Sequence, residues 1–260
     1  IYRMTYTATD QKNGTINVTG PEIAKWNSGN FEAATEAVFE NQYTERGSFK
    51  VSGIKKVEGN NLSAFTFGLF ADPECKTELT RASNETSGAD AGKFTISHTV
   101  TIDELAVEDQ DGNITGYSKS KDFTYYLKEI AEDGDGYDVS DAVYEVKVTM
   151  KDQGDGTLVP SNQSVTLVPG TAPTTGGIIF TNKYNAEGSY ELSGTKTVKD
   201  GNLIPGFKFS IYEADGETPA KNAESATVSS DDNGNFRFKL NFTNEYLLER
   251  GTYSKSRAFT

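Results

Sequence analysis

Apolar and polar residues alternate along most of this chain, and this period of two is the pattern of β-strands with one buried face. In one stretch the residues on the apolar face are Phe49, Val51, Gly53, Lys55 and Val57. Further alternating stretches cover residues 65–70, 94–100, 123–129, 144–150, 165–168 and 178–184. Residues 80–92, 107–116 and 170–177 are rich in turn-forming types and are predicted to be loops or turns. The pattern therefore predicts an all-β protein with roughly seven to nine strands in its central part.

One part of this pattern occurs twice. Residues 39–62 read FENQYTERGSFKVSGIKKVEGNNL, and residues 180–203 read FTNKYNAEGSYELSGTKTVKDGNL. Tyr43 corresponds to Tyr184 and Lys55 to Lys196, so the period is 141 residues, the length of one domain. We therefore expect residues 1–44 to be the closing part of a β-sandwich domain, residues 45–184 a complete domain, and residues 185–260 the opening part of a further domain.

The first 44 residues show the same alternation. Tyr2, Met4, Tyr6 and Ala8 share a face and are predicted to point inward, and residues 10–14 are predicted to form a hairpin turn. Residues 21–36 are ambiguous, and a short helix over residues 31–37 is one interpretation.

Three polar residues lie in otherwise apolar rows. Lys55 lies in the row described above, Glu129 follows Phe123, Tyr125 and Leu127, and Asn182 lies between Phe180 and Tyr184. A buried lysine without a partner is costly, so it must be neutral, paired or covalently consumed. The repeat places Lys196 at the position that corresponds to Lys55, and Asn41 at the position that corresponds to Asn182.

These residues, in this order, resemble the self-forming isopeptide-bond domains of Gram-positive pilin backbone subunits and collagen-adhesin B-type surface proteins. The G-x-K-x-V segment at Lys55, the Y-x-L-K-E segment ending at Glu129 and the F-T-N-x-Y segment around Asn182 are similar to the streptococcal pilin isopeptide-linkage repeat family. The resemblance covers nearly the whole chain. It implies tandem immunoglobulin-like β-sandwich domains, with Lys196 and Asn41 in the same role in their own domains.

The chemistry that the resemblance implies is a Lys55–Asn182 cross-link. The Lys55 amine, kept neutral by burial, would attack the side-chain carbonyl carbon of Asn182 and release ammonia. Glu129 would polarise the carbonyl group and shuttle protons, which makes it the catalytic residue of a single-turnover reaction rather than part of an enzyme. The alternative is a buried Lys–Glu ion pair in which Asn182 is only a hydrogen-bond partner.

Composition excludes several function classes. The net charge of −13 and the pI of about 4.6 argue against nucleic acid and anionic membrane surfaces as partners. The single cysteine excludes an intrachain disulfide, and no apolar run is long enough to cross a membrane. The acidic turns at residues 109–112, 133–136 and 152–156 lack the bidentate glutamate of a calcium loop, so neither a metal nor a cofactor is expected.

Other candidate residues are weaker. His98 has no nucleophile at a known spacing, Cys75 is expected to be an inert loop thiol, and Asn244 lies in an F-T-N-x-Y-like segment that maps to the middle of a domain. The expected function is therefore a structural shaft or stalk on a Gram-positive cell wall or pilus, outside the cell. Its partners would be neighbouring subunits or repeats. The alternative is a ligand-binding adhesin module that recognises a host glycan or matrix protein.

The beginning and the end of the chain correspond to complementary parts of one repeat. Two interpretations stay open: the chain is a piece of a longer tandem array, or these parts complete one another between neighbouring subunits. On either interpretation, targeting and anchoring segments are expected to lie outside this chain.

Overall fold

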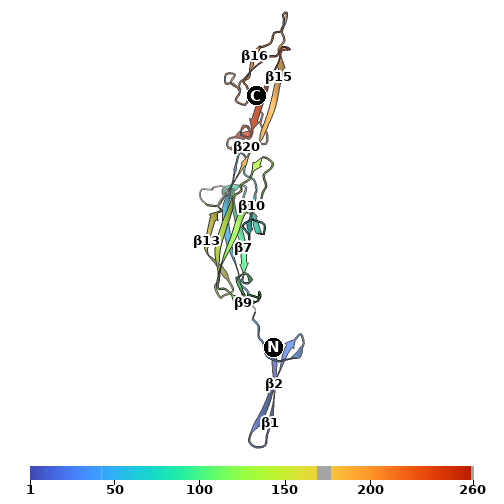
Figure 1. The fold of residues 1–260 in the computed structure, drawn as a ribbon, viewed down its shortest axis with the longest axis vertical. Helices are drawn as coiled ribbons and strands as arrows, with labels where there is room; N and C mark the ends of the chain where they lie inside the picture. Colours follow the sequence, from blue (N-terminus) through green and yellow to red (C-terminus); the bar gives the residue numbers. More distant parts are fainter. Residues whose placement is uncertain (42, 169–176, 259–260) are drawn as a thin grey trace. The chain divides into compact units, whose positions relative to one another are not determined.

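The computed structural model of the chain describes residues 1–41, 43–168 and 177–258 (Figure 1). It divides into two compact units, Ile1–Thr44 and Glu45–Thr260. Both units are built from β-strands, so the predicted all-β class is confirmed. No helix in the described ranges is long and apolar enough to span a membrane.

One sheet of the second unit holds the first and last strands of the central sandwich. Strand β4 (Arg46–Glu58) pairs antiparallel with β7 (Lys93–Thr101) and parallel with β14 (Ile179–Tyr184). The short strand β11 (Tyr137–Asp138) pairs with the other edge of β14. The alternation of buried and exposed residues along β4 matches the predicted face, with Lys55 inward and Lys56 outward.

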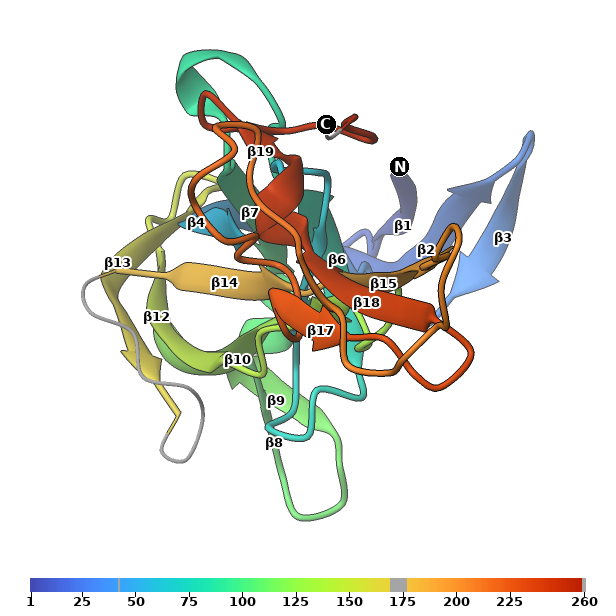
Figure 2. The ribbon, with the colours of Figure 1, turned by 90° about the horizontal axis from the view of Figure 1, so that it is seen from above.

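The opposing sheet has five antiparallel strands in the order β13-β12-β10-β5-β6. Their bounds are Leu158–Leu167 for β13, Val143–Asp152 for β12, Ser120–Glu129 for β10, Thr66–Phe70 for β5 and Glu78–Ser83 for β6. Figure 2 shows β12 and β10 as neighbours in this sheet. The loop prediction for residues 80–92 is wrong at its start, because β6 forms there. This strand has no fully buried side chain, and its pairing with β5 holds it in place.

The space between the two sheets is an aromatic and aliphatic core. Its centre is a set of stacked and tilted rings. The centroid of the Phe67 ring lies 3.9 Å from that of the Phe94 ring and 5.0 Å from that of the Phe180 ring. Leu127, Val146 and other buried side chains complete it. Burial of this apolar surface supplies the main driving force for folding of the sandwich. The predicted sandwich is therefore confirmed for this part of the chain.

Smaller elements fill the connections of the sandwich. The turn prediction for residues 107–116 is wrong at both ends, because β8 (Ala106–Glu108) and β9 (Ile114–Tyr117) form a hairpin whose tip is the rest of this segment. The 3₁₀ helices η1 (Gly88–Asp90) and η2 (Ile102–Leu105) flank β7. Of the predicted loop at 170–177, all but residue 177 lies outside the described residues.

The remainder of the second unit repeats the opening strands of the sandwich. Strand β15 (Glu187–Thr195) pairs with β18 (Asn235–Thr243), and β16 (Lys208–Ser210) pairs with β17 (Thr227–Ser229). The 3₁₀ helix η3 (Asn244–Leu247) follows, and then β19 (Leu248–Glu249) and β20 (Thr252–Tyr253). The row that repeats the apolar face of β4 is open here, with Tyr190 61% and Leu192 40% exposed.

The first unit is a three-stranded antiparallel sheet of β1 (Tyr2–Asp10), β2 (Ile16–Asn27) and β3 (Asn30–Ala34). The turn predicted after β1 is present, and the backbone amide of Lys12 donates to the Asp10 carboxylate there. The helical interpretation of residues 31–37 is wrong, because residues 30–34 pair with β2. The inward orientation expected for Met4 and Tyr6 is also wrong: they are 48% and 57% exposed, since the described part of this unit is a single layer.

Candidate cross-link site

Three elements of the sandwich bring Lys55, Glu129 and Asn182 together. Lys55 and Asn182 come from the neighbouring parallel strands β4 and β14, where Lys55 is paired with Phe180 and Asn182 with Val57. Glu129 ends β10 in the opposing sheet. The three residues are 2%, 1% and 0% exposed, respectively. The predicted rows are thus observed, and the two sheets hold three polar side chains in one apolar interior.

Glu129 bridges the other two side chains. The Lys55 Nζ atom donates to Glu129 Oε2 at 2.7 Å, and the Asn182 Nδ2 atom donates to Glu129 Oε1 at 2.7 Å. The amine and the amide therefore contact the two oxygens of a single carboxylate. Such a group can pass a proton from one neighbour to the other without moving far.

The other side of the Asn182 amide contacts the main chain. The backbone N–H of Ser140 donates to Asn182 Oδ1 at 2.9 Å. Because a backbone N–H can only donate, the atom that faces it must be the amide oxygen, and the nitrogen must then face Glu129. Glu129 thus contacts the Asn182 nitrogen, so the expectation that it polarises the Asn182 carbonyl group is wrong. The carbonyl is polarised by Ser140, which sequence reasoning missed because a main-chain donor has no residue signature.

An aromatic ring completes the surroundings of the lysine. The Lys55 Nζ atom lies 4.4 Å from the centroid of the Phe65 ring, a cation–π distance. Phe65 was not predicted as part of the site, although a phenylalanine follows the lysine in both copies of the repeat: Phe65 follows Lys55, and Phe207 follows Lys196. The structure of the second copy is similar, with Lys196 Nζ lying 5.2 Å from the centroid of the Phe207 ring.

Burial changes the acid–base behaviour of the lysine. Removal of the ammonium group from water lowers the pKa of Lys55 from 10.5 to about 8, and the hydrogen bond and charge of Glu129 only partly oppose this effect. A larger fraction of the Lys55 amine is therefore neutral near neutral pH than for an exposed lysine. A neutral amine has the free electron pair that a nucleophile needs.

The repeat counterparts of Lys55 and Asn182, which are Lys196 and Asn41, are not brought into such a site among the described residues. Lys196 directly follows β15 and is half-buried. Asn41 lies in the first unit, where it is exposed and outside any strand. The described residues of the first F-x-N-x-Y segment therefore form no strand, in contrast to the corresponding segment around Asn182.

The weaker candidates have other surroundings. The His98 ring packs against Phe49 and Tyr125, with centroid distances of 5.8 and 5.3 Å, and burial lowers its pKa. Burial raises the pKa of the Cys75 thiol, which disfavours the reactive thiolate. Within the described ranges, no group of three or more His, Cys, Asp or Glu side chains is placed to hold a metal ion.

The fold is a β-sandwich with a buried Lys–Glu–Asn cluster that links its two sheets. The family model described as the Spy0128-like isopeptide containing domain matches residues 51–185, which is more than half of the chain and includes Lys55, Glu129 and Asn182. The chain therefore belongs to this family.

Solved structures of pilins are similar to the chain in outline. A variant of the major pilin of Streptococcus pyogenes is 15% identical, covers 75% of this chain and 76% of its own, and has a TM-score of 0.35. A variant of the shaft pilin SpaA of Lactobacillus rhamnosus GG is also 15% identical, covers 75% of this chain and 82% of its own, and has a TM-score of 0.24. No curated protein matches the chain.

Proposed function

We propose that Lys55 and Asn182 join in an isopeptide bond that the domain forms by itself. The lone pair of the Lys55 amine attacks Cγ of Asn182, the bond between Cγ and Nδ2 breaks, and ammonia leaves. One proton of the Lys55 amine passes through Glu129 to the departing nitrogen, so atoms and charges balance. The observation that carries this proposal is the placement of both reacting groups on one buried carboxylate, each at 2.7 Å.

Each contact of the site has a role in this reaction. The Ser140 N–H stabilises the negative charge that develops on the Asn182 oxygen, as the donors of an oxyanion hole do. Glu129 accepts a proton on one oxygen and donates one from the other. The dry interior holds the amine and the amide together, so that proximity supplies much of the rate. The reaction occurs once per domain and turns over no substrate, so we propose that the protein is not an enzyme.

The position of the bond supports a mechanical function. It would connect β4, the first strand of the sandwich, to β14, the last, and these strands are parallel neighbours. Tension that enters at β4 and leaves at β14 would then pass through a covalent amide, and the hydrogen bonds between the strands would carry little of it. We therefore propose a shaft subunit or stalk of a Gram-positive cell-surface pilus, with neighbouring subunits or repeats as its partners.

The rate of bond formation should depend on pH. Because the neutral amine reacts, the rate constant is expected to rise about tenfold per pH unit below the Lys55 pKa of about 8 and to level off above it. Chain recovered unfolded from inclusion bodies would be refolded over a pH series on both sides of this value. Intact mass after acid quenching measures the loss of ammonia at each time. A rate that is independent of pH would contradict the role given to Lys55.

Force should extend the protein less when the bond is present. If the full chain is pulled from its two ends, the residues between 55 and 182 are expected to stay folded in the wild type and to extend in Asn182→Ala. At about 3.5 Å per residue, the extra extension is roughly 450 Å. Single-molecule force spectroscopy measures it, with Asn202→Ala, an exposed asparagine in the second copy, as the control. Equal extension of the wild type and Asn182→Ala would argue against the shaft proposal.

A further inference from the structure

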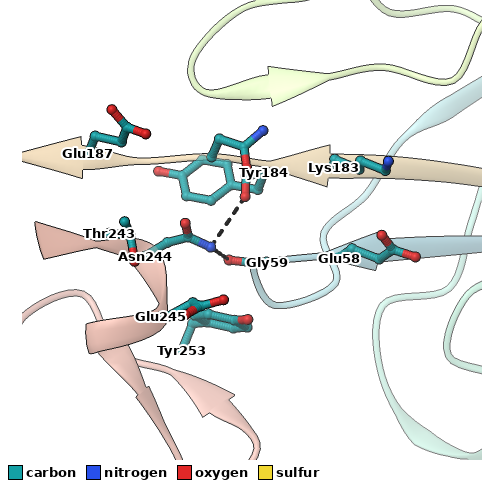
Figure 3. A pocket seen from close by; sticks show the side chains of 10 residues that line it. Glu58, Gly59, Lys183, Tyr184, Glu187, Thr243, Asn244, Glu245 and Tyr253 are labelled. Carbon is teal, nitrogen blue, oxygen red and sulfur yellow. Dashed lines mark hydrogen bonds between the residues drawn. The ribbon is translucent and has the colours of Figure 1, made fainter. Parts of the chain in front are cut away.

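Only two residues, Asn185 and Ala186, separate the last strand of the sandwich, β14, from the first strand of the next repeat, β15. A short connection of this kind can act as a hinge unless side chains hold it. Figure 3 shows the surroundings of this connection, where the end of β4, the end of β14 and the helix η3 meet.

Asn244, the first residue of η3, contacts three segments at once. Its Nδ2 atom donates to the carbonyl oxygen of Gly59 at 2.7 Å and to that of Tyr184 at 3.2 Å (Figure 3). Its Oδ1 atom accepts from the backbone N–H of Ala186 at 3.4 Å. Both hydrogens of the Asn244 amide group and its oxygen are therefore used at the connection between the repeats.

A second asparagine, Asn61 of the preceding sandwich, contacts the backbone of the following repeat. The Asn61 Nδ2 atom donates to the Tyr253 carbonyl oxygen at 2.7 Å, and the Tyr253 backbone N–H donates to Asn61 Oδ1 at 3.0 Å. This two-bond pairing fixes the orientation of β20 relative to the turn that follows β4.

Gly59 allows the first of these contacts. Its φ is +84°, and a Cβ atom there would lie 2.3 Å from the Tyr184 oxygen and 2.8 Å from Asn244 Nδ2. The corresponding residue one period later is Asp200, which has a φ of +57°. The turn by itself therefore accepts a side chain, and glycine at position 59 is required by the close approach of Tyr184 and Asn244.

The local fold does not require an asparagine at position 244 either. The backbone N–H of Asn244 donates to the Ala186 oxygen, just as the N–H of Ile102 donates to the Glu45 oxygen in the first copy. Ile102 begins η2 as Asn244 begins η3, and its side chain is buried in the core of its own domain. The same backbone geometry thus carries an apolar residue in one copy and the junction amide in the other.

The junction also borders a hollow. Beside Asn244 lies an open pocket of about 380 Å³. Its charged lining residues are Glu58, Lys183, Glu187 and Glu245. Next to this hollow, the hydrogen bonds of the two asparagines tie the repeats to each other.

We propose that Asn61 and Asn244 form a docking interface through which the end of one β-sandwich holds the start of the next repeat, so that the two move as one rigid segment. The partner of this surface is the following repeat of the same chain. The inference rests on contacts outside the Lys55–Asn182 site and stands whether or not the cross-link forms. A rigid junction transmits force along the chain without bending at each connection.

Backbone ¹⁵N relaxation of the full chain tests this proposal, because it reports the rotational correlation time of each part. The wild type is expected to show one common correlation time for residues 45–184 and 187–258. The variant Asn61→Ala/Asn244→Ala is expected to show two, and Gly59→Ala should act in the same direction. Asn202→Ala, which changes the repeat counterpart of Asn61, should leave a single correlation time.

Two separate correlation times in the wild type, or a single one in the double variant, would overturn the proposal. If Asn244→Ala unfolds residues 187–258, Asn61→Ala alone decides, because Asn61 is an exposed residue of the preceding domain. In that variant, hydrogen exchange of the Tyr253 amide is expected to accelerate at least about tenfold, the equivalent of about 1.4 kcal/mol. Exchange at the wild-type rate would contradict the interface.

Discussion

Asn182→Ala is expected to have the full mass of its sequence, whereas the wild type should be lighter by one ammonia. The substitution removes the acceptor carbonyl and leaves the pair of Lys55 and Glu129 in place. It therefore separates a covalent bond from a buried ion pair, since an ion pair changes no mass in either protein. Intact-mass spectrometry under denaturing conditions measures the difference.

The same variant should be much less stable. The proposed bond would close a loop from residue 55 to residue 182, and the loop-entropy model for cross-links assigns such a loop on the order of 5 kcal/mol. For a domain of this size the melting temperature is expected to fall by on the order of 15 °C. Calorimetry of wild type, Asn182→Ala and the control Asn202→Ala measures it. Melting of Asn182→Ala within a few degrees of the wild type would show that no such loop is closed.

Glu129→Gln is expected to slow bond formation by roughly 10²–10⁴-fold, the usual contribution of a positioned acid–base group. Glutamine keeps the shape of the side chain and its hydrogen-bonding ability, but it cannot relay a proton from the Lys55 amine to the Asn182 nitrogen. The time course of ammonia loss after refolding, followed by intact mass, gives the rate constant.

Glu45→Gln is the matched control for this experiment. Glu45 is the other buried glutamate of the domain, and its Oε1 atom accepts from the backbone N–H of Gly156. Its substitution changes a buried carboxylate outside the cross-link site, so it should leave the rate of ammonia loss unchanged. A Glu129→Gln protein that cross-links as fast as the wild type would remove Glu129 from the mechanism.

The positions of the three site residues could be predicted from residue spacing. In a strand the side-chain direction alternates strictly, so Lys55, Glu129 and Asn182 had to share faces with their apolar neighbours. The repeat of 141 residues likewise needed only the order of residues. The face of each residue follows from the period of two in a strand, and the repeat follows from comparing one part of the sequence with another.

The pairing of strands, in contrast, could not be predicted from residue spacing. Residues 78–83 have no apolar face, and their strand exists because β5 offers its backbone groups. Residues 30–34 form β3 for the same reason, although their side chains alone allowed a helix. In both segments, hydrogen bonds to a neighbouring strand override local preference.

Tertiary structure alone revealed the two contacts that give the site and the junction their chemistry. The Ser140 N–H that faces Asn182 and the carbonyl oxygens that hold Asn244 are main-chain groups, which every residue possesses. Which of them meets a given side chain depends on how distant segments approach in three dimensions. The chain therefore reveals the polar side chains of its buried site through their spacing, while their main-chain partners appear only once the strands are packed.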